Sequence, residues 1–373
     1  MNFLNKLKAK RTAQFYRRFV QFGFLAVIIW IGIKFSIFVN QLERGAEQVI
    51  SRPPGVESFL PISSLMSLKY WILTGKFNHV HPFGVLVFIV ILATAFLLKR
   101  GFCSWVCPVG LLSEYLAKIH VLIFDRPRNL PRWLDYPLRS LKYLILLFFL
   151  WAVLVQMNVI DLQKFIYSPY NKVADIKMLL FFTNMSSFTA RVLIGLALLS
   201  ILVRFFWCRY LCPYGALLGL TSWASLFKIR RNPDTCTDCR KCTKACPMNI
   251  KVHKEKVVMS DECNACLQCV AVCPVENTLT FSTAKTKVRL RPAGYALVIV
   301  VLFLGVTALA RLIGVWQNNI STQEYRYHIK HLNDPSYYHN RGQVPDYQSQ
   351  SLWNKKEPSD SLAVLLKNRH SFN

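Results

Sequence analysis

The chain has 373 residues, of which 53% are hydrophobic and 17% charged, and its formal net charge is +27. Its apolar residues gather into runs near the roughly 20 residues that cross a bilayer, which a soluble core rarely needs. The basic excess lies in alternate loops between these runs, and no nucleic-acid-binding module is recognisable. We therefore predict a membrane protein that does not bind nucleic acid.

Five apolar segments in chain order predict about five transmembrane helices, and hence an α-helical integral membrane protein. They are residues 19–39, 82–98, 143–160, 192–207 and 293–310. The second and fourth are short for a span, so their ends must snorkel or the following helix must continue the burial.

The distribution of basic residues predicts the orientation. Lys and Arg number twenty-nine in residues 1–18, 99–142 and 204–292, against fifteen in the opposite loops and the tail. Loops rich in Lys and Arg stay in the cytoplasm, so we expect the N-terminus there and the C-terminus in the periplasm. The prediction is a multi-pass protein of the bacterial inner membrane, embedded in the lipid bilayer.

A ten-residue repeat recurs at an offset of 105. Residues 101–110 (GFCSWVCPVG) align with residues 206–215 (FWCRYLCPYG), and each copy follows an even-numbered apolar segment. Two parallel helix-pair repeats are therefore predicted, related by a pseudo-two-fold axis along the membrane normal.

Twelve cysteines with short, regular spacing indicate metal ligation in a reducing compartment rather than disulfides. The pattern CxxCxxCxxxCP occurs at residues 236–247 and again at 263–274, as in bacterial two-cluster ferredoxins, where the fourth cysteine ligates the other cluster. Two 4Fe–4S clusters are therefore predicted, the first held by Cys236, Cys239, Cys242 and Cys273, the second by Cys263, Cys266, Cys269 and Cys246. A pair of zinc sites is the alternative, which two full runs with trailing prolines disfavour.

The repeat contributes four further thiols, Cys103 and Cys107 with Cys208 and Cys212. At i and i+4 on a helix each pair shares a face, and the repeat axis brings the two pairs toward each other. Four thiolates can hold a further iron–sulfur cluster or a soft metal such as copper or zinc, or each pair can cycle between dithiol and disulfide. Buried small side chains in a helix-packing turn are the alternative without a ligand.

Other polar residues give weaker signals. His79 and His81 can serve a haem or a quinone, or form an interfacial polar cap. Glu114 can relay a proton or lie on a solvated helix face, and His120 and His253 are expected in solvent. No nucleophile–base pair or phosphate-binding loop is recognisable, so no catalytic residue is assigned. We expect an electron-transfer subunit rather than a stand-alone catalyst.

The chain is expected to divide into five parts. They are a cytoplasmic basic N-terminus (1–18), a four-helix membrane domain with both CxxxCP repeats (19–228), a small cytoplasmic α+β two-cluster ferredoxin domain (229–291), a fifth transmembrane helix (292–311) and a periplasmic tail (312–373).

With both CxxxCP repeats and the double ferredoxin run in this order, residues 15–291 resemble the membrane-bound polyferredoxins of the NapH/NosR/CcoG type. The loop of residues 52–61 (RPPGVESFLP) is similar as well, and we expect it to shape the outer face. The resemblance implies 4Fe–4S ferredoxin-type electron transport in respiration, between the quinol pool or a cytoplasmic donor and a respiratory reductase or its maturation.

Three hypotheses for the function follow. The first is a membrane electron relay through the two clusters and the CxxxCP thiols. The second is a metal-handling or assembly factor, in which the CxxxCP pairs bind or reduce copper with electrons from the ferredoxin segment. The third is a structural membrane subunit whose clusters only stabilise the fold.

Overall fold

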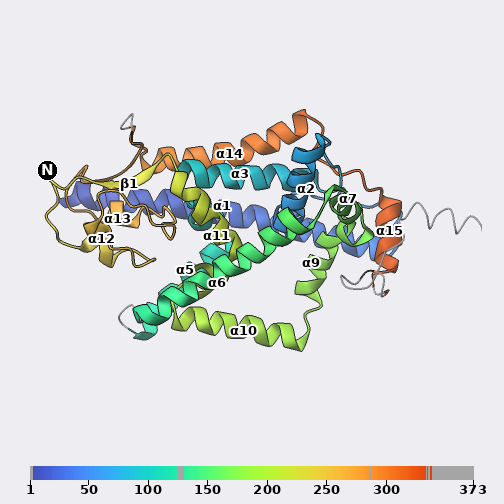
Figure 1. Ribbon diagram of the computed structural model, residues 1–373, viewed down its shortest axis with the longest axis horizontal. Coiled ribbons are helices and arrows are strands. Elements are labelled where there is room, and N and C mark those ends of the chain that lie inside the picture. Colours follow the sequence, from blue (N-terminus) through green and yellow to red (C-terminus); the bar gives the residue numbers. More distant parts are fainter. Residues whose placement is uncertain (1–2, 125–129, 285–287, 333, 335–336, 338–373) are drawn as a thin grey trace, which may run out of the picture.

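The structure, a computed structural model, describes residues 3–124, 130–284 and 288–332, together with Asp334 and Tyr337. The described part is mostly helical, and its one sheet has two strands. Long helices run along the molecule, and shorter elements gather at its two ends (Figure 1). The predicted helical architecture is confirmed at this level, whereas most of the predicted periplasmic tail lies outside the described residues.

Each predicted apolar segment overlaps a long helix. These helices are α1 (Phe3–Glu43), α3 (Pro82–Leu98), α6 (Arg132–Trp151), α10 (Ser187–Leu202) and α14 (Pro292–Leu312). Pro at the first helical position begins α3 and α14, where its missing N–H costs no hydrogen bond. A helical turn with wider hydrogen bonding, η2 (Ala152–Gln156), continues α6.

Three apolar stretches are long enough to cross a membrane. They are residues Ala13–Glu43, Trp133–Gln156 and Pro292–Leu312. α9 (Ala174–Thr183) and α10 pass the same test together but are bent by 79°, and α3 is apolar but shorter. The described residues therefore contain three candidate spans, or four with the bent pair, and the count of five stays a prediction.

The predicted fourth segment, residues 192–207, differs from the helix that forms there. α10 ends at Leu202, and Phe205 has a left-handed φ of 59°, which the α-helix does not accommodate. Lys99 has the same φ of 59° directly after α3. Both helices therefore stop shortly before a CxxxCP sequence, which places the two cysteine pairs in turns beyond the helix ends.

The short elements at one end of the molecule, together with the turns and loops between them, carry all twelve cysteines. They are α4 (Gly101–Trp105), α5 (Pro108–Phe124), η3 (Trp207–Leu211), α11 (Pro213–Thr221), η4 (Ser222–Ala224), β1 (Lys228–Arg231), α12 (Lys241–Lys244), η5 (Val252–Lys254), α13 (Gln268–Ala271) and β2 (Leu279–Ser282). β1 and β2 pair antiparallel, with Lys228 opposite Ser282 and Arg231 opposite Leu279.

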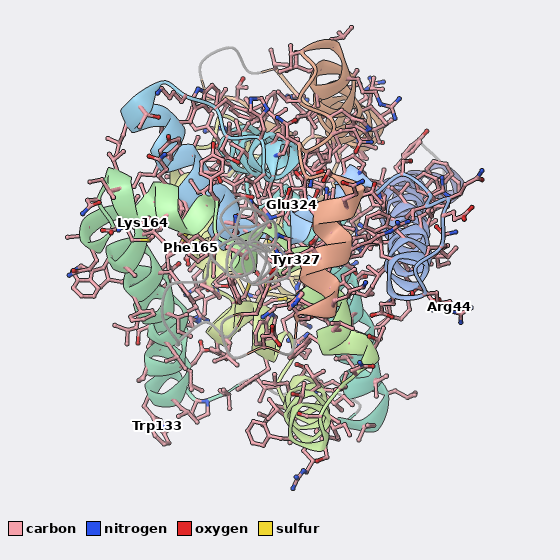
Figure 2. All side chains as sticks on the ribbon, turned by 90° about the vertical axis from the view of Figure 1, so that its right-hand side faces the viewer. Arg44, Trp133, Lys164, Phe165, Glu324 and Tyr327 are labelled. Carbon is pink, nitrogen blue, oxygen red and sulfur yellow. The ribbon has the colours of Figure 1, made fainter. Side chains whose placement is uncertain are left out.

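The opposite end holds η1 (Pro54–Phe59), α2 (Pro61–Thr74), α7 (Val159–Ile166), α8 (Pro169–Lys172), α9 and α15 (Thr322–Lys330). Figure 2 looks onto this end, where Glu324 and Tyr327 of α15 lie near its centre. The start of α1 lies at the cysteine-bearing end, whereas α15 lies at the other (Figure 1). The start of α1 and α15 thus lie at opposite ends of the described molecule, while the sides of a membrane on which the N-terminus and the C-terminal tail lie stay a prediction.

A buried ionic cluster ties the elements of the α15 end together. The Arg52 guanidinium donates to Glu57 at 2.8 Å and to Asp175 at 2.7 Å, and all three side chains are buried. The second oxygen of Glu57 accepts the main-chain N–H of Gly84 at 3.1 Å, at the N-terminus of α3, where the helix dipole favours an anion. The loop of residues 52–57 is thus packed inside this end of the molecule.

The cysteine-bearing segment and the long helices share one hydrophobic core. Val20 of α1, Leu98 of α3 and Tyr295 of α14 belong to the same cluster of buried residues as Phe281 of β2 and Cys269 of α13. The ring of Tyr295 stacks on Trp105 at 4.5 Å and meets Phe281 edge-on at 5.2 Å. The ferredoxin-like segment is therefore packed onto the helix ends and is not a free-standing domain.

Candidate cofactor sites

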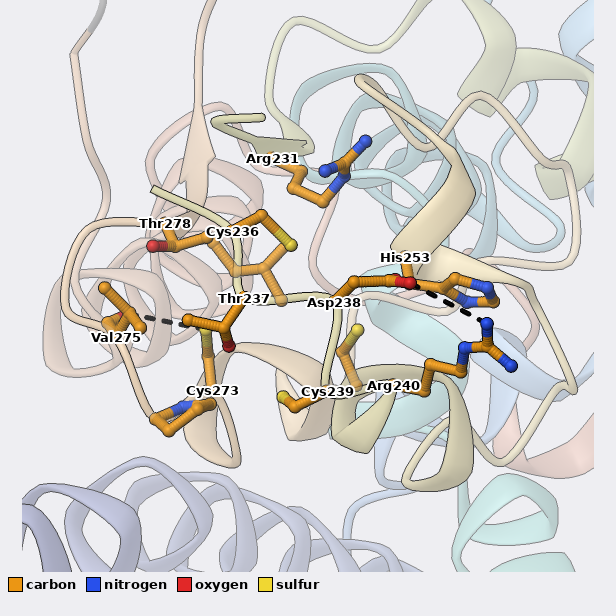
Figure 3. Close-up of a pocket in the computed structure, with 13 residues that line it drawn as sticks. Arg231, Cys236, Thr237, Asp238, Cys239, Arg240, His253, Cys273, Val275 and Thr278 are labelled. Carbon is orange, nitrogen blue, oxygen red and sulfur yellow. Dashed lines mark hydrogen bonds and ion pairs between the residues drawn. The ribbon is translucent and has the colours of Figure 1, made fainter. Parts of the chain in front are cut away.

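The first predicted ligand set surrounds one hollow. Cys236, Cys239, Cys242 and Cys273 all line a space of about 350 Å³. Figure 3 shows Cys236 and Cys239 approaching it from the loop before α12, and Cys273 from the other ferredoxin run. The sequence predicted this exchange of the fourth cysteine between runs, and the structure brings these four residues together.

The second set surrounds a separate hollow of about 360 Å³. Its lining includes Cys263, Cys266, Cys269 and, from the first run, Cys246. The sulfur atoms of both sets are soft donors suited to iron–sulfur clusters. Among the described residues, which include all twelve cysteines, no three His, Cys, Asp or Glu side chains are close enough to share a single metal ion.

The ligand turns of the two runs have the same backbone conformation. Asp238 and Arg240 have left-handed φ values of 45° and 57°, and Ala265 and Leu267 have 49° and 58° at the equivalent positions. A residue with a Cβ adopts this region at a cost, and such strain persists where function requires it. The left-handed residues alternate with the cysteines, which lets three thiols of each run face one space.

The two hollows differ in exposure. Cys239 is exposed, whereas Cys266 and Cys269 are buried. Burial raises the pKa of the Cys266 thiol to about 12. The main-chain N–H of Lys241 lowers the pKa of Cys239. A bound metal must therefore displace protons from the buried thiols, and its binding is coupled to that deprotonation.

The two CxxxCP pairs do come together. Cys103 and Cys208 line a third hollow of about 420 Å³. Burial is the main cause that raises the pKa of Cys107, and the neighbouring thiols of Cys103 and Cys208 raise it further. Cys212 accepts the main-chain N–H of Gly215 at 3.2 Å, and Cys208 lies 3.3 Å from the Ser113 hydroxyl. The four thiols are thus neighbours, while the repeat axis itself stays a prediction.

The pairs do not lie on one continuous helix, which corrects the expected i, i+4 geometry. α4 ends at Trp105, between Cys103 and Cys107. Cys208 lies in η3, and Cys212 caps the N-terminus of α11. Pro108 and Pro213 begin the next helices, as their position after the second cysteine predicted. The second thiol of each pair therefore lies at the start of a new helix.

Side chains of the first CxxxCP repeat and its surroundings bind the ligand loop of the second hollow. The main-chain carbonyls of residues 259–266 accept hydrogen bonds at six positions: Met259 and Ser260 from Lys99 at 3.1 and 2.9 Å, Asp261 from Arg100 at 2.9 Å, Asn264 from Ser104 at 2.5 Å, Ala265 from Trp105 at 3.1 Å, and Cys266 from Gln14 at 3.2 Å. The loop that carries Cys263 and Cys266 is therefore fixed to the turn that carries Cys103.

Residues in and near the second CxxxCP repeat contact the segment that carries Cys246, the fourth cysteine of the same hollow. Arg209, next to Cys208, donates to the carbonyl of Met248 at 3.1 Å, two residues after Cys246. Arg204 donates to the Asn249 side chain at 2.6 Å. Cys208 and Cys246 also pack around the same small apolar cluster. Both repeats thus contact segments that line the second hollow.

Buried charges reinforce this docking. Glu262 accepts a hydrogen bond from Lys142 of α6 and lies 3.5 Å from Arg100, and all three side chains are almost fully buried. Asp261 accepts a hydrogen bond from Tyr143. Burial alone would raise the pKa of Asp261, but the Tyr143 hydroxyl and the nearby Lys142 and Arg100 outweigh it, so the pKa is lowered.

The second and third hollows are neighbours. Four residues line both of them, namely Cys266, Pro247, Met248 and Asn264. Arg17, Arg100 and Glu114 add charge to the third hollow. Arg17 binds Glu114 through two hydrogen bonds of 2.7 and 2.8 Å. Glu114 therefore forms a nearly buried ion pair with Arg17, and the alternative that it lies on a solvated helix face is wrong.

The histidines are placed as follows. His120 is buried and its ring bonds the carbonyl of Ile201 at 2.7 Å, so its predicted solvation is wrong. His253 is half-buried against the Thr243 hydroxyl at 2.7 Å. His81 is buried at the opposite end of the molecule, where its ring bonds the carbonyl of Asn171 at 2.7 Å. Of these three histidines, only His253 lines one of the described hollows, namely the first.

Two family models match the chain. One is described as a 4Fe-4S binding domain and matches residues 80–129 and 189–232, each of which contains one CxxxCP sequence. The other is described as a 4Fe-4S dicluster domain and matches residues 228–274, which contain all eight cysteines of the two ferredoxin runs.

Curated relatives match as well. YccM of Escherichia coli (strain K12), named as an electron transport protein, is 42% identical over 322 residues, which cover 85% of this chain and 90% of YccM. The uncharacterized protein MJ0749 of Methanocaldococcus jannaschii is 30% identical over 44% of this chain and 58% of its own length. The regulatory protein NosR of Pseudomonas aeruginosa is 27% identical over 46% of this chain and 23% of its own length. No solved structure matches the chain.

Fold, cysteine pattern and relatives together define a membrane-associated, ferredoxin-type 4Fe–4S electron transport protein. Within that class, the chain belongs to the family of YccM. The predicted resemblance to membrane polyferredoxins is confirmed.

Sequence reasoning missed the polar residues that join the sites. Lys99 and Arg100 directly precede the first CxxxCP repeat, and they were counted only as basic loop residues. Their buried contacts with residues 259–262 show a second role. Glu262 gave a usable signal, because an acid directly before a ligand cysteine in a chain this basic needs a cationic partner.

Proposed function

We propose that the protein relays electrons across three adjoining sites: a first 4Fe–4S cluster, a second 4Fe–4S cluster and a CxxxCP thiolate site. The observation that carries this proposal is the contact between the second and third hollows, which share Cys266 and are joined by the hydrogen bonds to residues 259–266. A protein whose clusters only stabilised the fold would need no such contact between separate thiol sites.

The residues present fit the clusters. Cys236, Cys239, Cys242 and Cys273 would hold the first, and Cys263, Cys266, Cys269 and Cys246 the second, because each set lines its own hollow. Bound there, the clusters supply one-electron exchange at a potential set by charge, hydrogen bonding and exposure. The chain contributes the buried Arg17 and Arg100, which line the third hollow, and the buried Lys99 near Cys263. These cations favour the reduced, more negative state.

For Cys103, Cys107, Cys208 and Cys212 we propose a further iron–sulfur cluster. Four neighbouring soft donors suit it, and the model that matches both CxxxCP segments is described as a 4Fe-4S binding domain. Arg100 lies close to Cys103 and Cys212, where its positive charge offsets that of the thiolates. Each of Cys107 and Cys212 lies at a helix N-terminus, which also favours a thiolate.

The partners and the location are part of the same proposal. The distribution of Lys and Arg supports an inner-membrane protein with the ferredoxin segment in the cytoplasm. The start of α1 and all three hollows lie at one end of the molecule, as that orientation requires. Electrons would pass between the quinol pool or a cytoplasmic donor and a respiratory reductase.

A second candidate function is metal handling or cofactor maturation driven by the same clusters. It is favoured by the partial likeness to NosR, which is named as a regulatory protein, and by the soft four-thiol set beside the second hollow. Copper that binds to the purified protein and is lost in the Cys103→Ser/Cys208→Ser variant would favour it over the relay.

Anaerobic purification with iron quantitation and EPR tests the relay. Two 4Fe–4S clusters require about eight irons per chain, and a third raises the number to about twelve. The Cys103→Ser/Cys208→Ser variant should lose only the third contribution. Fewer than about eight irons in the intact chain would refute the two-cluster proposal. Addition of a quinol to membranes that contain the protein then tests whether quinol reduces the clusters.

A further inference from the structure

The face around Cys239 differs from the rest of the cysteine-bearing end. Among the twelve cysteines, all of which the structure describes, Cys239 alone is exposed. It lines the first hollow, which is the hollow that shares no lining residue with the third. The first hollow is therefore the part of the proposed relay that an external protein can approach.

Exposed cations are frequent in the segment that carries this cysteine. The segment from residue 234 to residue 256 contains six exposed basic side chains and three exposed acidic ones. The six are Arg240, Lys241, Lys244, Lys251, Lys254 and Lys256, which we call the basic face. A 2.7 Å hydrogen bond between Thr243 and His253 holds α12 against η5, so the two halves of the basic face belong to one surface. Figure 3 shows Arg240 beside Cys239.

The basic face is not neutralised within the chain. Arg240 has Asp238 at 3.7 Å, with both side chains more than half exposed. None of the five lysines takes part in an ion pair in the described part of the chain. The cations near the helix ends behave differently, because Lys99, Lys142 and Arg17 are buried and bound to carbonyls or carboxylates. The positive charge of the basic face is thus available to a partner.

We propose that the basic face docks a soluble, acidic, one-electron carrier protein that reduces the chain at the Cys236–Cys242 turn. This rests on the proposed relay and adds its electron donor. Charge complementarity selects an acidic partner, and the exposed Cys239 next to Arg240 selects a redox protein. The carrier loses one electron and the chain gains it, with no bond formed or broken. Such steering raises association rates and weakens as salt rises.

The test uses the full chain in nanodiscs of neutral phosphatidylcholine, with flavodoxin hydroquinone as the acidic carrier. Lys241→Glu/Lys244→Glu reverses two charges of the basic face. Lys76→Glu/Lys164→Glu makes the same change in net charge with two exposed lysines of the α15 end, where Figure 2 shows Lys164. Binding of flavodoxin is measured by biolayer interferometry and the rate of reduction by stopped-flow absorbance. Iron content and the dithionite-reduced EPR signal are compared first.

The basic-face variant should bind flavodoxin about tenfold more weakly and be reduced about tenfold more slowly, with unchanged iron. The α15-end variant should match the wild type, and about 0.5 M salt should bring the wild type to the level of the basic-face variant. If Lys241→Glu/Lys244→Glu lowers the iron content, Lys254→Glu/Lys256→Glu repeats the comparison outside α12.

The docking proposal would be overturned if the basic-face variant and the α15-end variant changed flavodoxin binding equally. It would also be overturned if flavodoxin binding to the wild type did not depend on salt. Wild-type nanodiscs that adhere to phosphatidylglycerol vesicles through the basic face but do not bind flavodoxin would overturn it as well, because the face would then recognise lipid. A wild-type chain without reducible clusters refutes the relay itself. Reducible clusters with no charge-dependent flavodoxin binding refute only the docking surface.

Discussion

The indole N–H of Trp105 donates to the main-chain carbonyl of Ala265 at 3.1 Å, and both residues are fully buried. Trp105 lies between Cys103 and Cys107, and Ala265 between Cys263 and Cys266. One buried hydrogen bond therefore joins the middle of a CxxxCP turn to the middle of a ferredoxin ligand turn. The distance between the second and third sites is set by this contact and its neighbours, not by a flexible linker.

Replacing Trp105 by Phe should loosen this junction. The substitution keeps an aromatic ring against Tyr295 but leaves the buried carbonyl of Ala265 without its donor, which costs about 1–3 kcal/mol. We expect full iron content but faster hydrogen exchange in residues 259–269, measured by mass spectrometry. Trp223→Phe is the matched control, because Trp223 is 57% exposed. Unchanged exchange in Trp105→Phe would show that this bond does not hold the loop.

The cysteine pattern predicted the grouping of the sites better than it predicted their surroundings. The sets around the first two hollows follow from spacing, because a run of three close cysteines leaves its fourth, Cys246 or Cys273, directed elsewhere. The contacts of residues 259–266 with the first CxxxCP turn could not be predicted from the sequence. Any residue type has a main-chain carbonyl that can accept such hydrogen bonds, so the accepting positions carry no sequence signal. The early end of α10 was missed because φ at Phe205 leaves no mark in hydrophobicity.

The exchange of the fourth cysteine can be tested by single substitutions. Cys246→Ala should remove the cluster of the second hollow, although Cys246 belongs in sequence to the first run. Cys273→Ala should remove the cluster of the first hollow. EPR of each reduced variant shows which of the two clusters is missing. The two clusters should give different signals, because the first hollow has the exposed Cys239 and the second has buried thiols. The reverse result, with each run losing its own cluster, would contradict the assignment.

The buried ionic cluster at the α15 end predicts a loss of stability in acid. Burial alone would raise the pKa of Glu57, but Arg52 and then His81 outweigh it, and the pKa is lowered. A carboxyl whose folded pKa is depressed stabilises the fold above its unfolded value of about 4.3, and this contribution is lost as pH falls through the folded pKa. Guanidinium unfolding followed by fluorescence should therefore show a drop from about pH 6 to about pH 3.

Glu57→Gln should flatten that pH dependence. The variant loses a charged hydrogen bond to Arg52, so it should be less stable by about 1–3 kcal/mol at neutral pH and lose less on acidification. Glu47→Gln provides the control, because Glu47 is exposed in the loop after α1 and should leave the wild-type slope intact. A Glu57→Gln variant with the wild-type slope would assign the acid sensitivity to other carboxyls.

The third thiol site depends on a glycine that has no room for a side chain. Gly110 lies one turn into α5, and a Cβ at this position would overlap the main-chain carbonyl oxygen of Cys103. Backbone cannot yield as a flexible side chain can, so Gly110→Ala must displace the Cys103 turn from the start of α5. The aligned Gly215 is less tight, since its added Cβ would meet Arg100 at 3.0 Å.

Gly110→Ala should therefore lose the metal of the CxxxCP site and retain the two ferredoxin-type clusters. Iron per chain is expected to fall from about twelve to about eight, as in Cys103→Ser/Cys208→Ser. Gly195→Ala makes the same exchange in α10, where an added Cβ meets nothing within 4 Å, and should keep all the iron. Because alanine favours helix over glycine by up to about 1 kcal/mol, Gly195→Ala is expected to be at least as stable as the wild type. Full iron in Gly110→Ala would contradict this prediction, because the cluster of the CxxxCP site would then not depend on the packing of the Cys103 turn against Gly110.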